Sequence, residues 1–515
     1  MMRIGKSIGW LLGSLLIVLP GCILLLPDWF PGQEKDPIKK VMPLFDAVVE
    51  HNFQQSLVPG AAVGVVYNDQ VIYSRCLGVR KAGASEAVDA DTLFQIASVS
   101  KSFNSSLIAT LVQDDLMDWD DKVVQYWPEF QMYDPWVTHE LTIRDCLSHR
   151  CGLPKYAGDE LVPMFGYDQA EVYARMKYHK PVTGFRTTFA YQNIIYALTG
   201  ELASRRTGKD WPALVTQRIF QPLGMTRSVA TLADYEKEEN RAYPHCLDDE
   251  VMTVVEPWCD DLVPGAGAVS STLSDMIRWV RMQLNEGNLD GRTVVKRELL
   301  QETHSPETLI STTDSGVLSY GMGWMINAAG GHLAVFHGGD YLGVSAMVYL
   351  MPKEKVGVVI LTNAYPTGNI YARSLYKTLD DLVVKGTCEK DWWADSVEAA
   401  EAAAAEAAES EKTIVLPDPP SPVVPGLEPA VYAGEYQNDF YGTVRIAVAG
   451  EGLQIYYGKN PVPTPLSHWN EHTYKDTSTG TGVIFRLGSD HQPAEMEVVV
   501  LGLDGRDGHF TRVDP

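Results

Sequence analysis

Apolar residues in the first two thirds of the chain follow both strand-like and helix-like spacings. Two β-rich stretches, residues 61–76 and 345–362, each have a polar turn at their centre and predict β-hairpins. Between them, residues 98–112 place Phe103 and Leu107 on one side, which predicts a helix. Strands near both ends with helices between them favour one antiparallel sheet built from both ends of a domain.

The last quarter of the chain has a different pattern. Residues 396–412 are nearly all Ala and Glu and predict an exposed helical spacer, and residues 416–426 are proline-rich and predict an extended segment. We assign residues 386–426 to a linker. From Gly442 apolar and polar residues alternate in short runs broken by glycines, so residues 427–515 are expected to form a small antiparallel β-sheet or barrel.

The N-terminus has the pattern of an export signal. Arg3 and Lys6 precede an apolar run over residues 8–26, which is long enough to span a bilayer. Residues 19–22, Leu-Pro-Gly-Cys, resemble a bacterial lipobox. An uncleaved anchor, a lipoprotein and a cleaved signal all remain open for residues 1–35. Each predicts an exported protein, anchored to the membrane or extracytoplasmic.

Composition limits the classes of partner. With 515 residues, two or three domains are expected, and the net charge of −24 disfavours binding to nucleic acid. The seven cysteines include no C-x-x-C pair, which argues against a zinc ribbon or a redox motif. Disulfides and buried free thiols both remain open. We therefore expect a small-molecule or peptide substrate, with the membrane contacted through the N-terminal segment.

A candidate nucleophile lies at the start of the predicted helix. Ser98 and Lys101 form an S-x-x-K element, and one helical turn brings the lysine amine beside the serine hydroxyl. A serine hydroxyl needs a base to become nucleophilic, and the start of a helix supplies N–H groups for an oxyanion. The same spacing recurs at Ser374 and Lys377, so this pattern alone does not identify a site.

Context makes the assignment specific. Three segments occur in one order, FQIASVSKSF, FAYQN and FHGGDYLG, and they resemble the active-site elements of the serine β-lactamase-like family. This family includes penicillin-binding proteins, class C β-lactamases, D-aminopeptidases and family VIII esterases. The segments LTIRDCLSHRCGLP and PGAGAVSSTLSDMIRW also resemble family sequences. The resemblance implies that residues 36–385 form an α/β catalytic domain, an antiparallel sheet flanked by helices plus a helical lobe, without metal or cofactor.

The resemblance also implies roles for residues of the first two elements. Ser98 would be acylated, Lys101 would be its hydrogen-bonded partner, and Tyr191 would relay the proton. Asn193 would hold the substrate amide and the lysine. Whether the lysine or the tyrosine acts as the base stays open. His149 is expected to be structural.

The third element departs from the Lys-Thr-Gly of β-lactamases. His337, Gly338 and Gly339 would bind substrate there, and an imidazole binds a carboxylate less strongly than an ammonium does. The backbone N–H groups of Ser98 and Asp340 would form the oxyanion hole. The Asp340 side chain is expected to point away from that oxyanion.

These roles predict a serine hydrolase that acts through an acyl-enzyme. Residues 431–446, VYAGEYQNDFYGTVRI, resemble the lipocalin-like β-barrel appended to some peptidases of the family, where it can assist oligomerisation or shape the substrate entrance. A peptide or amide is therefore the first expectation for the substrate, followed by an ester and then a β-lactam, and a homo-oligomer is compatible with this domain. A catalytically weak peptide-binding or scaffold protein is the alternative of another class. An α/β-hydrolase is disfavoured because Ser98 lacks the glycines of a G-x-S-x-G elbow.

Overall fold

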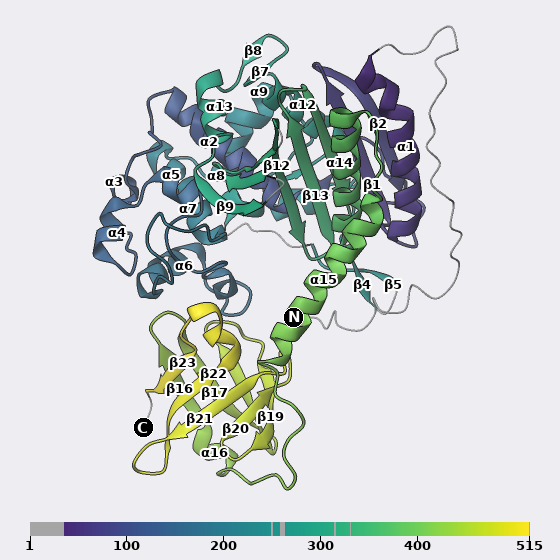
Figure 1. The fold of residues 1–515 in the computed structure, drawn as a ribbon. Helices are drawn as coiled ribbons and strands as arrows, with labels where there is room; N and C mark the ends of the chain where they lie inside the picture. The colour runs from purple at the N-terminus through teal and green to yellow at the C-terminus, as the bar shows by residue number, and fades with distance from the viewer. Residues whose placement is uncertain (1–35, 249–250, 258–262, 314–315, 330, 514–515) are drawn as a thin grey trace.

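A large antiparallel sheet forms the centre of the catalytic part of the chain (Figure 1). The computed structural model describes residues 36–248, 251–257, 263–313, 316–329 and 331–513. The eight strands have the order β2-β1-β14-β13-β12-β11-β10-β9. They are β1 (Gly60–Tyr67), β2 (Gln70–Gly78), β9 (Thr308–Thr313), β10 (Gly316–Tyr320), β11 (Met325–Ala329), β12 (His332–Tyr341), β13 (Val344–Met351) and β14 (Val356–Thr362).

The two ends of the domain meet in this sheet, as the hydrophobic pattern predicted. Each predicted hairpin forms, and β1 pairs antiparallel with β14 so that Val63 lies opposite Ile360. Both residues are fully buried. Burial of the apolar side chains on both faces of the sheet therefore stabilises the pairing of two strands that are far apart in the sequence.

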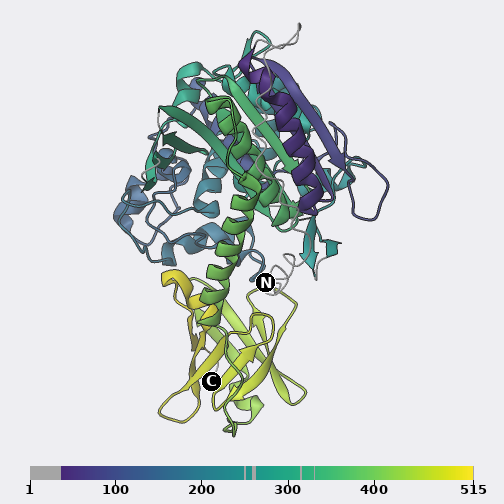
Figure 2. The ribbon, with the colours of Figure 1, turned by 45° about the vertical axis from the view of Figure 1, so that its right-hand side comes forward.

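Helices cover both faces of the sheet (Figures 1 and 2). On one face α1 (Pro37–Ser56) packs against α14 (Thr367–Lys385), and on the other α12 (Leu273–Leu284) lies across β1 and β14. Phe103 and Trp279 join α12 to the helical lobe, with ring centroids 3.8 Å apart and planes 14° apart. The predicted combination of a flanked sheet and a helical lobe is confirmed.

The helical lobe consists of short helices around one buried helix. Its helices are α2 (Ser100–Gln113), α3 (Val123–Tyr126), α4 (Pro135–Glu140), α5 (Ile143–Leu147), α6 (Gln169–Arg175), α7 (Asn193–Thr207), α8 (Trp211–Val215), α9 (Gln221–Leu223) and α10 (Leu232–Lys237). Nearly every residue of α2 is buried, including its polar ones. A helix that is buried on all sides holds its first residues rigidly. The start of α2 is therefore a place where the fold can fix the position of a reactive side chain.

The C-terminal part is a closed antiparallel barrel of eight strands, which confirms the expected β-barrel. Its strands are β16 (Gly434–Asn438), β17 (Gly442–Ala449), β18 (Gly452–Tyr457), β19 (Thr464–Asn470), β20 (Thr473–Asp476), β21 (Gly482–Leu487), β22 (Pro493–Val498) and β23 (His509–Arg512). In β17, Val444 and Ile446 face the interior and Arg445 faces out, as the alternation predicted. Val448 breaks this pattern and is exposed.

The Ala- and Glu-rich segment is helical, but the helix is not exposed along its whole length. Helix α15 (Trp392–Lys412) begins before the predicted spacer. The Trp392 indole donates a hydrogen bond to Asp381 of α14 at 2.8 Å, and Ser396 is buried. Residues 402–407 are exposed. The first turns pack because two tryptophans precede the Ala/Glu run, which the spacer prediction left out.

The predictions for the N-terminal segment fall on residues 1–35, which lie outside the described residues. Among the residues that the structure describes, no helix is both long and apolar enough to cross a membrane. Five cysteines in the described part are free thiols: Cys76, Cys146, Cys151, Cys246 and Cys388.

Candidate active site

Ser98 lies in a tight turn at the start of α2. The turn is a 3-10 helix over Ala97–Val99, so the α-helix begins two residues later than predicted, at Ser100. Ala97 has φ 44°, in the left-handed region that non-glycine residues seldom occupy. A strained residue of this kind is typical of sites where the fold fixes the orientation of a neighbouring side chain, here that of Ser98.

Lys101 is completely buried one turn further along and is held by three acceptors. Its Nζ lies 3.2 Å from Ser98 Oγ, 2.7 Å from Asn193 Oδ1 and 3.0 Å from the carbonyl oxygen of Ala266. An ammonium has three N–H donors, and these three acceptors match that number. The resting site therefore holds a charged Lys101 in contact with the Ser98 hydroxyl.

Tyr191 completes the group around the lysine. The Lys101 Nζ lies 4.7 Å from the centre of the Tyr191 ring. Burial raises the pKa of Tyr191 well above its ordinary value, and a hydrogen bond with Ser98 acts in the opposite direction. Tyr191 is therefore a neutral phenol at rest, and it lies beside both Ser98 and Lys101.

Asn193, the first residue of α7, is oriented by a carboxylate that the sequence motifs did not reveal. Its Nδ2 donates to Asp159 Oδ2 at 2.6 Å while its Oδ1 faces Lys101. At most one Nδ2 hydrogen therefore remains for a substrate. Asp159 belongs to a short 3-10 helix, Asp159–Leu161, in a segment without a recognisable motif, so spacing could not have identified it.

His337 on β12 is buried and already engaged by protein atoms. Its Nε2 lies 3.0 Å from the Tyr320 hydroxyl and its Nδ1 lies 2.6 Å from the Gly338 carbonyl oxygen. Burial, reinforced by the nearby Lys101 charge, lowers the pKa of His337 to about 3. The imidazole is thus neutral, with Nδ1–H donating to Gly338 and Nε2 accepting from Tyr320. It presents no positive charge to a substrate carboxylate.

The strand that carries His337 runs directly against the turn that contains Ser98. A Cβ added to Gly339 would lie 2.0 Å from the Ile96 carbonyl oxygen and 3.0 Å from the Ser98 nitrogen. Asp340 follows, and because successive residues of a strand face opposite sides, its side chain is on the other face. The Asp340 carboxylate accepts from Ser345 Oγ at 2.5 Å and from Asn369 Nδ2 at 2.8 Å.

The Asp340 contacts lie on β13 and α14, away from Ser98. This is the orientation that a backbone oxyanion role for Asp340 requires. Asp340 is exposed as a residue, and the protein atoms packed around its carboxyl raise its pKa above the ordinary value through desolvation.

His149 packs against the ring of Tyr191. Its ring centroid lies 4.5 Å from that of Tyr191, and its Nδ1 accepts a hydrogen bond from the Gln192 backbone at 3.1 Å. Burial lowers the pKa of His149 well below its ordinary value, so the ring is neutral. Cys151 donates from Sγ to Gln192 Oε1 at 2.9 Å. His149 thus bonds the backbone, and Cys151 the side chain, of the residue that follows Tyr191.

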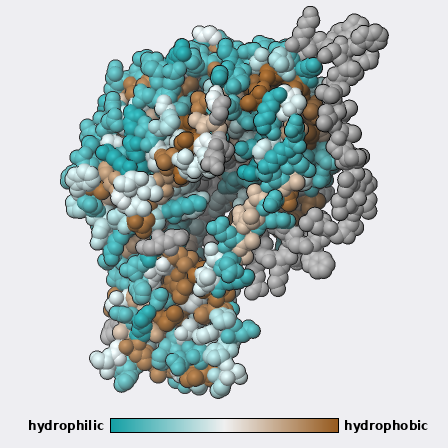
Figure 3. Space-filling view, viewed as in Figure 1, coloured by the Kyte–Doolittle hydropathy of each residue, from teal (hydrophilic) through white to brown (hydrophobic). Residues whose placement is uncertain are grey.

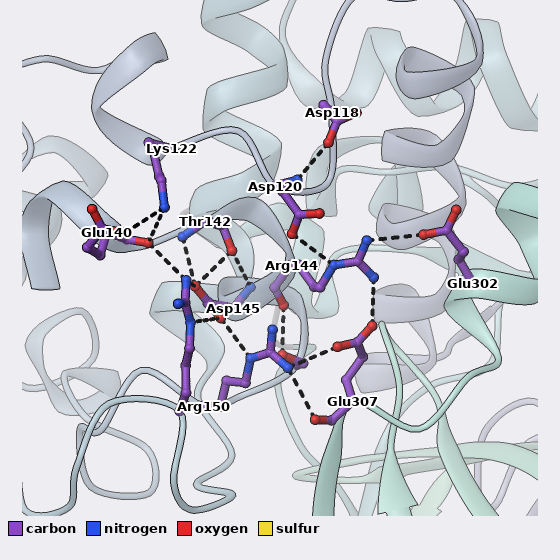
Figure 4. Close-up of polar contacts among 12 residues, drawn as sticks. Asp118, Asp120, Lys122, Glu140, Thr142, Arg144, Asp145, Arg150, Glu302 and Glu307 are labelled. Carbon is purple, nitrogen blue, oxygen red and sulfur yellow. Dashed lines mark hydrogen bonds and ion pairs between the residues drawn. The ribbon is translucent and has the colours of Figure 1, made fainter.

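A network of ion pairs fixes the segment that carries His149 (Figure 4). The Asp145 side chain is fully buried and accepts from Arg150 and Arg186, each at 2.7 Å. Arg150 also pairs with Glu307 at 2.9 Å, and Arg144 pairs with Glu307 at 2.6 Å. These contacts tie the helical lobe to the end of the sheet next to the site.

The other matches to the short patterns lie elsewhere. Ser374 is buried in α14, where its hydroxyl donates to the Tyr371 carbonyl oxygen. Tyr436, which begins a second Tyr-x-Asn match at residues 436–438, lies inside the barrel and donates to the Tyr432 carbonyl oxygen. In the part of the chain that the structure describes, no group of three His, Cys, Asp or Glu side chains is arranged to hold a metal ion.

Comparison with protein families gives two matches along the chain. A family model described as Beta-lactamase matches residues 45–379. A second model, described as a domain of unknown function (DUF3471), matches residues 418–512, which include all the strands of the barrel.

Individual relatives agree with the first match. Unguisins hydrolase ungD of Aspergillus violaceofuscus is 28% identical over 422 residues, which cover 76% of this chain and 74% of that protein. Protein flp of Staphylococcus aureus is 27% identical over 328 residues, which cover 62% of each protein. An octameric penicillin-binding protein homologue from Pyrococcus abyssi shares the fold over 91% of this chain and 100% of its own, with a TM-score of 0.60 and 19% identity.

Proposed function

Because the chain belongs to the beta-lactamase family of serine hydrolases, we propose that it hydrolyses an acyl substrate through an acyl-enzyme on Ser98. Family membership confirms the resemblance that the sequence motifs carried. The observation that supports this assignment of the nucleophile is the contact of Lys101 Nζ with Ser98 Oγ at 3.2 Å beside Tyr191. A nucleophile in contact with a proton-transferring partner is the arrangement that covalent catalysis requires.

The proposed reaction begins with attack of Ser98 Oγ on the substrate carbonyl carbon. The Lys101–Tyr191 pair first loses one proton to solvent, because a protonated lysine beside a neutral phenol cannot accept another. In this form the pair takes the serine proton, and the protonation states of its two members are coupled. The backbone N–H groups of Ser98 and Asp340 stabilise the oxyanion. The leaving group departs with a proton from the same pair, and water then hydrolyses the acyl-enzyme.

A peptide or amide is the first choice of substrate. On β12 the residues His337 to Tyr341 pair with β13, whereas the pairing with β11 ends at Phe336. Within the described residues, the edge of β12 beside Ser98 therefore has no partner strand. An extended peptide could add to this edge through backbone hydrogen bonds.

A neutral ester is the second candidate, and the state of His337 favours it over a β-lactam. β-Lactams carry a carboxylate, which a cation in the third element would bind. The buried, neutral His337 offers no such charge. A catalytically weak binding protein is disfavoured, because binding alone does not require Ser98, Lys101, Tyr191 and Asn193 to contact one another.

We also propose that the protein acts outside the cytoplasm. The basic residues followed by an apolar run in residues 1–35 support export. A homo-oligomer stays a proposal that rests on the appended barrel.

The test is labelling of the full-length chain with a fluorophosphonate, read by intact mass. We expect one adduct, absent in Ser98→Ala and retained in Ser85→Ala, a control at an exposed serine. Absence of any adduct on folded protein would contradict the hydrolase proposal. An adduct that survives in Ser98→Ala would place the nucleophile elsewhere. Rates on D- and L-peptide anilides, aryl esters and a chromogenic β-lactam would then rank the substrate classes.

A further inference from the structure

The barrel packs against one segment of the catalytic domain, residues 156–179, which also borders the active site. Phe165 of this segment stacks on Tyr441 of the barrel, with ring centroids 5.3 Å apart and planes 17° apart. Phe165 also meets Tyr457 edge-on at 5.5 Å. Phe165 and Tyr441 are fully buried, so this contact is a continuous apolar core across the two domains. Figure 3 shows apolar surface on the part of the barrel next to the catalytic domain.

Backbone atoms of the two domains also touch in this interface. The Lys459 amide donates to the Phe165 carbonyl oxygen at 2.8 Å, and the Tyr167 hydroxyl donates to the Tyr441 carbonyl oxygen at 2.8 Å. Gly458 has φ +53° and a Cβ there would lie 2.7 Å from the Phe165 oxygen. The barrel therefore fixes the backbone of this segment and does more than cover its side chains.

An ion pair connects the barrel to the residue next to Asp159. Arg506 Nη1 lies 3.2 Å from Glu160 Oε2, and the two side chains are only 16% and 15% exposed. A pair that is largely shielded from water interacts more strongly than a surface pair, and losing one partner is costly. Glu160 follows Asp159 in the same 3-10 helix, so the position of Glu160 constrains the position of Asp159.

A short series of contacts leads from this ion pair to the nucleophile. Asp159 Oδ2 accepts from Asn193 Nδ2 at 2.6 Å, and Asn193 Oδ1 accepts from Lys101 Nζ at 2.7 Å. Lys101 in turn contacts Ser98 Oγ at 3.2 Å. The orientation of the Asn193 amide therefore depends on where the Asp159 carboxylate lies.

We propose that the C-terminal barrel is required to arrange the active site. Arg506 and the Phe165 contact hold Asp159 in the position from which it orients Asn193 and, through it, Lys101. Asp159 is a positioning residue in this arrangement, since it acts on Ser98 through Asn193 and Lys101. The inference rests on the proposed function and adds a role for the barrel and for two residues, Asp159 and Arg506.

A role in positioning differs from a role in folding through its effect on pH dependence. The Asp159 carboxylate lies two hydrogen bonds from Lys101, and a nearby negative charge favours a protonated amine, so removal of Asp159 should change the pH dependence of acylation. The acid limb of the acylation rate should then move to lower pH. A barrel that only stabilises the fold would change the amount of active enzyme and leave that limb in place.

The experiment measures the second-order rate of Ser98 acylation by a fluorophosphonate against pH, with full-length variants. We expect Asp159→Ala to lower the rate about 100-fold and Arg506→Gln about 10-fold, both with the acid limb at lower pH. Arg506→Lys should recover part of the rate. Arg486→Gln is the matched control, because Arg486 pairs with Glu497 at 2.8 Å on the barrel surface.

Glu160→Gln removes the same ion pair from the catalytic side and should reproduce Arg506→Gln, which keeps the test decisive if one variant folds poorly. Wild-type rates and an unchanged acid limb in folded Asp159→Ala and Arg506→Gln would overturn this inference alone. Failure of the unmodified chain to acylate would overturn the proposed function and the inference with it.

Discussion

Lys101 and Asn193 contact each other through Nζ and Oδ1 at 2.7 Å, and both side chains have a second partner that fixes the direction of this bond. Asn193 donates to Asp159, and Lys101 reaches Ser98 and the Ala266 carbonyl oxygen. The amide can therefore accept from the lysine but cannot turn round without losing both contacts. This relationship makes the site sensitive to small changes at Asn193.

Replacing Asn193 by Ala should slow acylation of Ser98 by about 100-fold, equivalent to about 2.7 kcal/mol. The substitution removes one of the three acceptors of a buried ammonium, and the lysine loses its fixed position beside Ser98. The measurement is the second-order rate of fluorophosphonate labelling. Asn285→Ala, which removes a contact with Asp69 remote from the site, is the control and should label at the normal rate. Equal rates in both variants would contradict the role of Asn193.

Acid should destabilise the chain partly through His304. Burial lowers the pKa of His304 to about 4, whereas an unfolded histidine titrates near about 6.5. Between these values the unfolded chain binds more protons, so stability falls as pH falls from 6.5 towards 4. At pH 5 the loss from this one residue is about 2 kcal/mol.

The check compares urea unfolding at pH 7.5 and pH 5 for the unmodified chain and His304→Gln. The variant should lose about 2 kcal/mol less on acidification. His332, whose pKa is raised by Asp380, acts in the opposite sense, so only the difference between variants isolates His304. His51→Gln, at an exposed histidine, should keep the full loss. An identical loss in His304→Gln would exclude His304 as a source of the acid sensitivity.

Sequence patterns predicted most of the architecture because those parts depend on local periodicity. The pattern of apolar side chains predicts the hairpin that begins with β1 and the hairpin that ends with β14. It also predicts the alternation that buries Val444 and Ile446 in the barrel. The early start of α15 was missed because the Ala/Glu composition hid the packing of Trp392. Prediction from composition fails where one large side chain finds a partner distant in the sequence.

The candidate site was predictable only where its residues belong to ordered motifs. Ser98, Lys101, Tyr191 and Asn193 came from such motifs, and the structure brings them together. Asp159 lies in a segment without a motif, and only the tertiary fold places it beside Asn193. The neutral state of His337 could not be predicted from the sequence either, because it results from burial and from the Lys101 charge, which only the folded structure brings near the imidazole.

Removing the buried charge of Asp145 should lower the free energy of unfolding by about 3 kcal/mol. Asp145→Asn would leave Arg150 (Figure 4) and Arg186 without the carboxylate that both of them contact. Chemical denaturation measures the loss. Asp234→Asn, which removes an exposed ion pair with Lys237, should cost less than about 1 kcal/mol. Comparable losses in the two variants would show that the network in Figure 4 adds little stability.

Two adjacent glycines of β12 provide the sharpest test of how the strand contacts the turn that contains Ser98. A Cβ at Gly339 would lie 2.0 Å from the Ile96 carbonyl oxygen, which belongs to the backbone before Ser98 and cannot rotate away. A Cβ at Gly338 would lie 3.2 Å from the end of the flexible Met347 side chain, which can. Gly339→Ala should therefore push the strand away from the oxyanion site, whereas Gly338→Ala should be absorbed by a rotamer change.

We expect acylation of Ser98 to fall more than about 100-fold in Gly339→Ala and less than about 10-fold in Gly338→Ala, while both variants keep the cooperative unfolding of the parent. Gly339→Ala labelled at the normal rate would mean that the contact between β12 and the Ser98 turn is not needed for catalysis. Equal losses in the two variants would mean that β12 acts through its hydrogen bonds to β13, because both glycines lie in that ladder and only Gly339 meets the backbone beside Ser98.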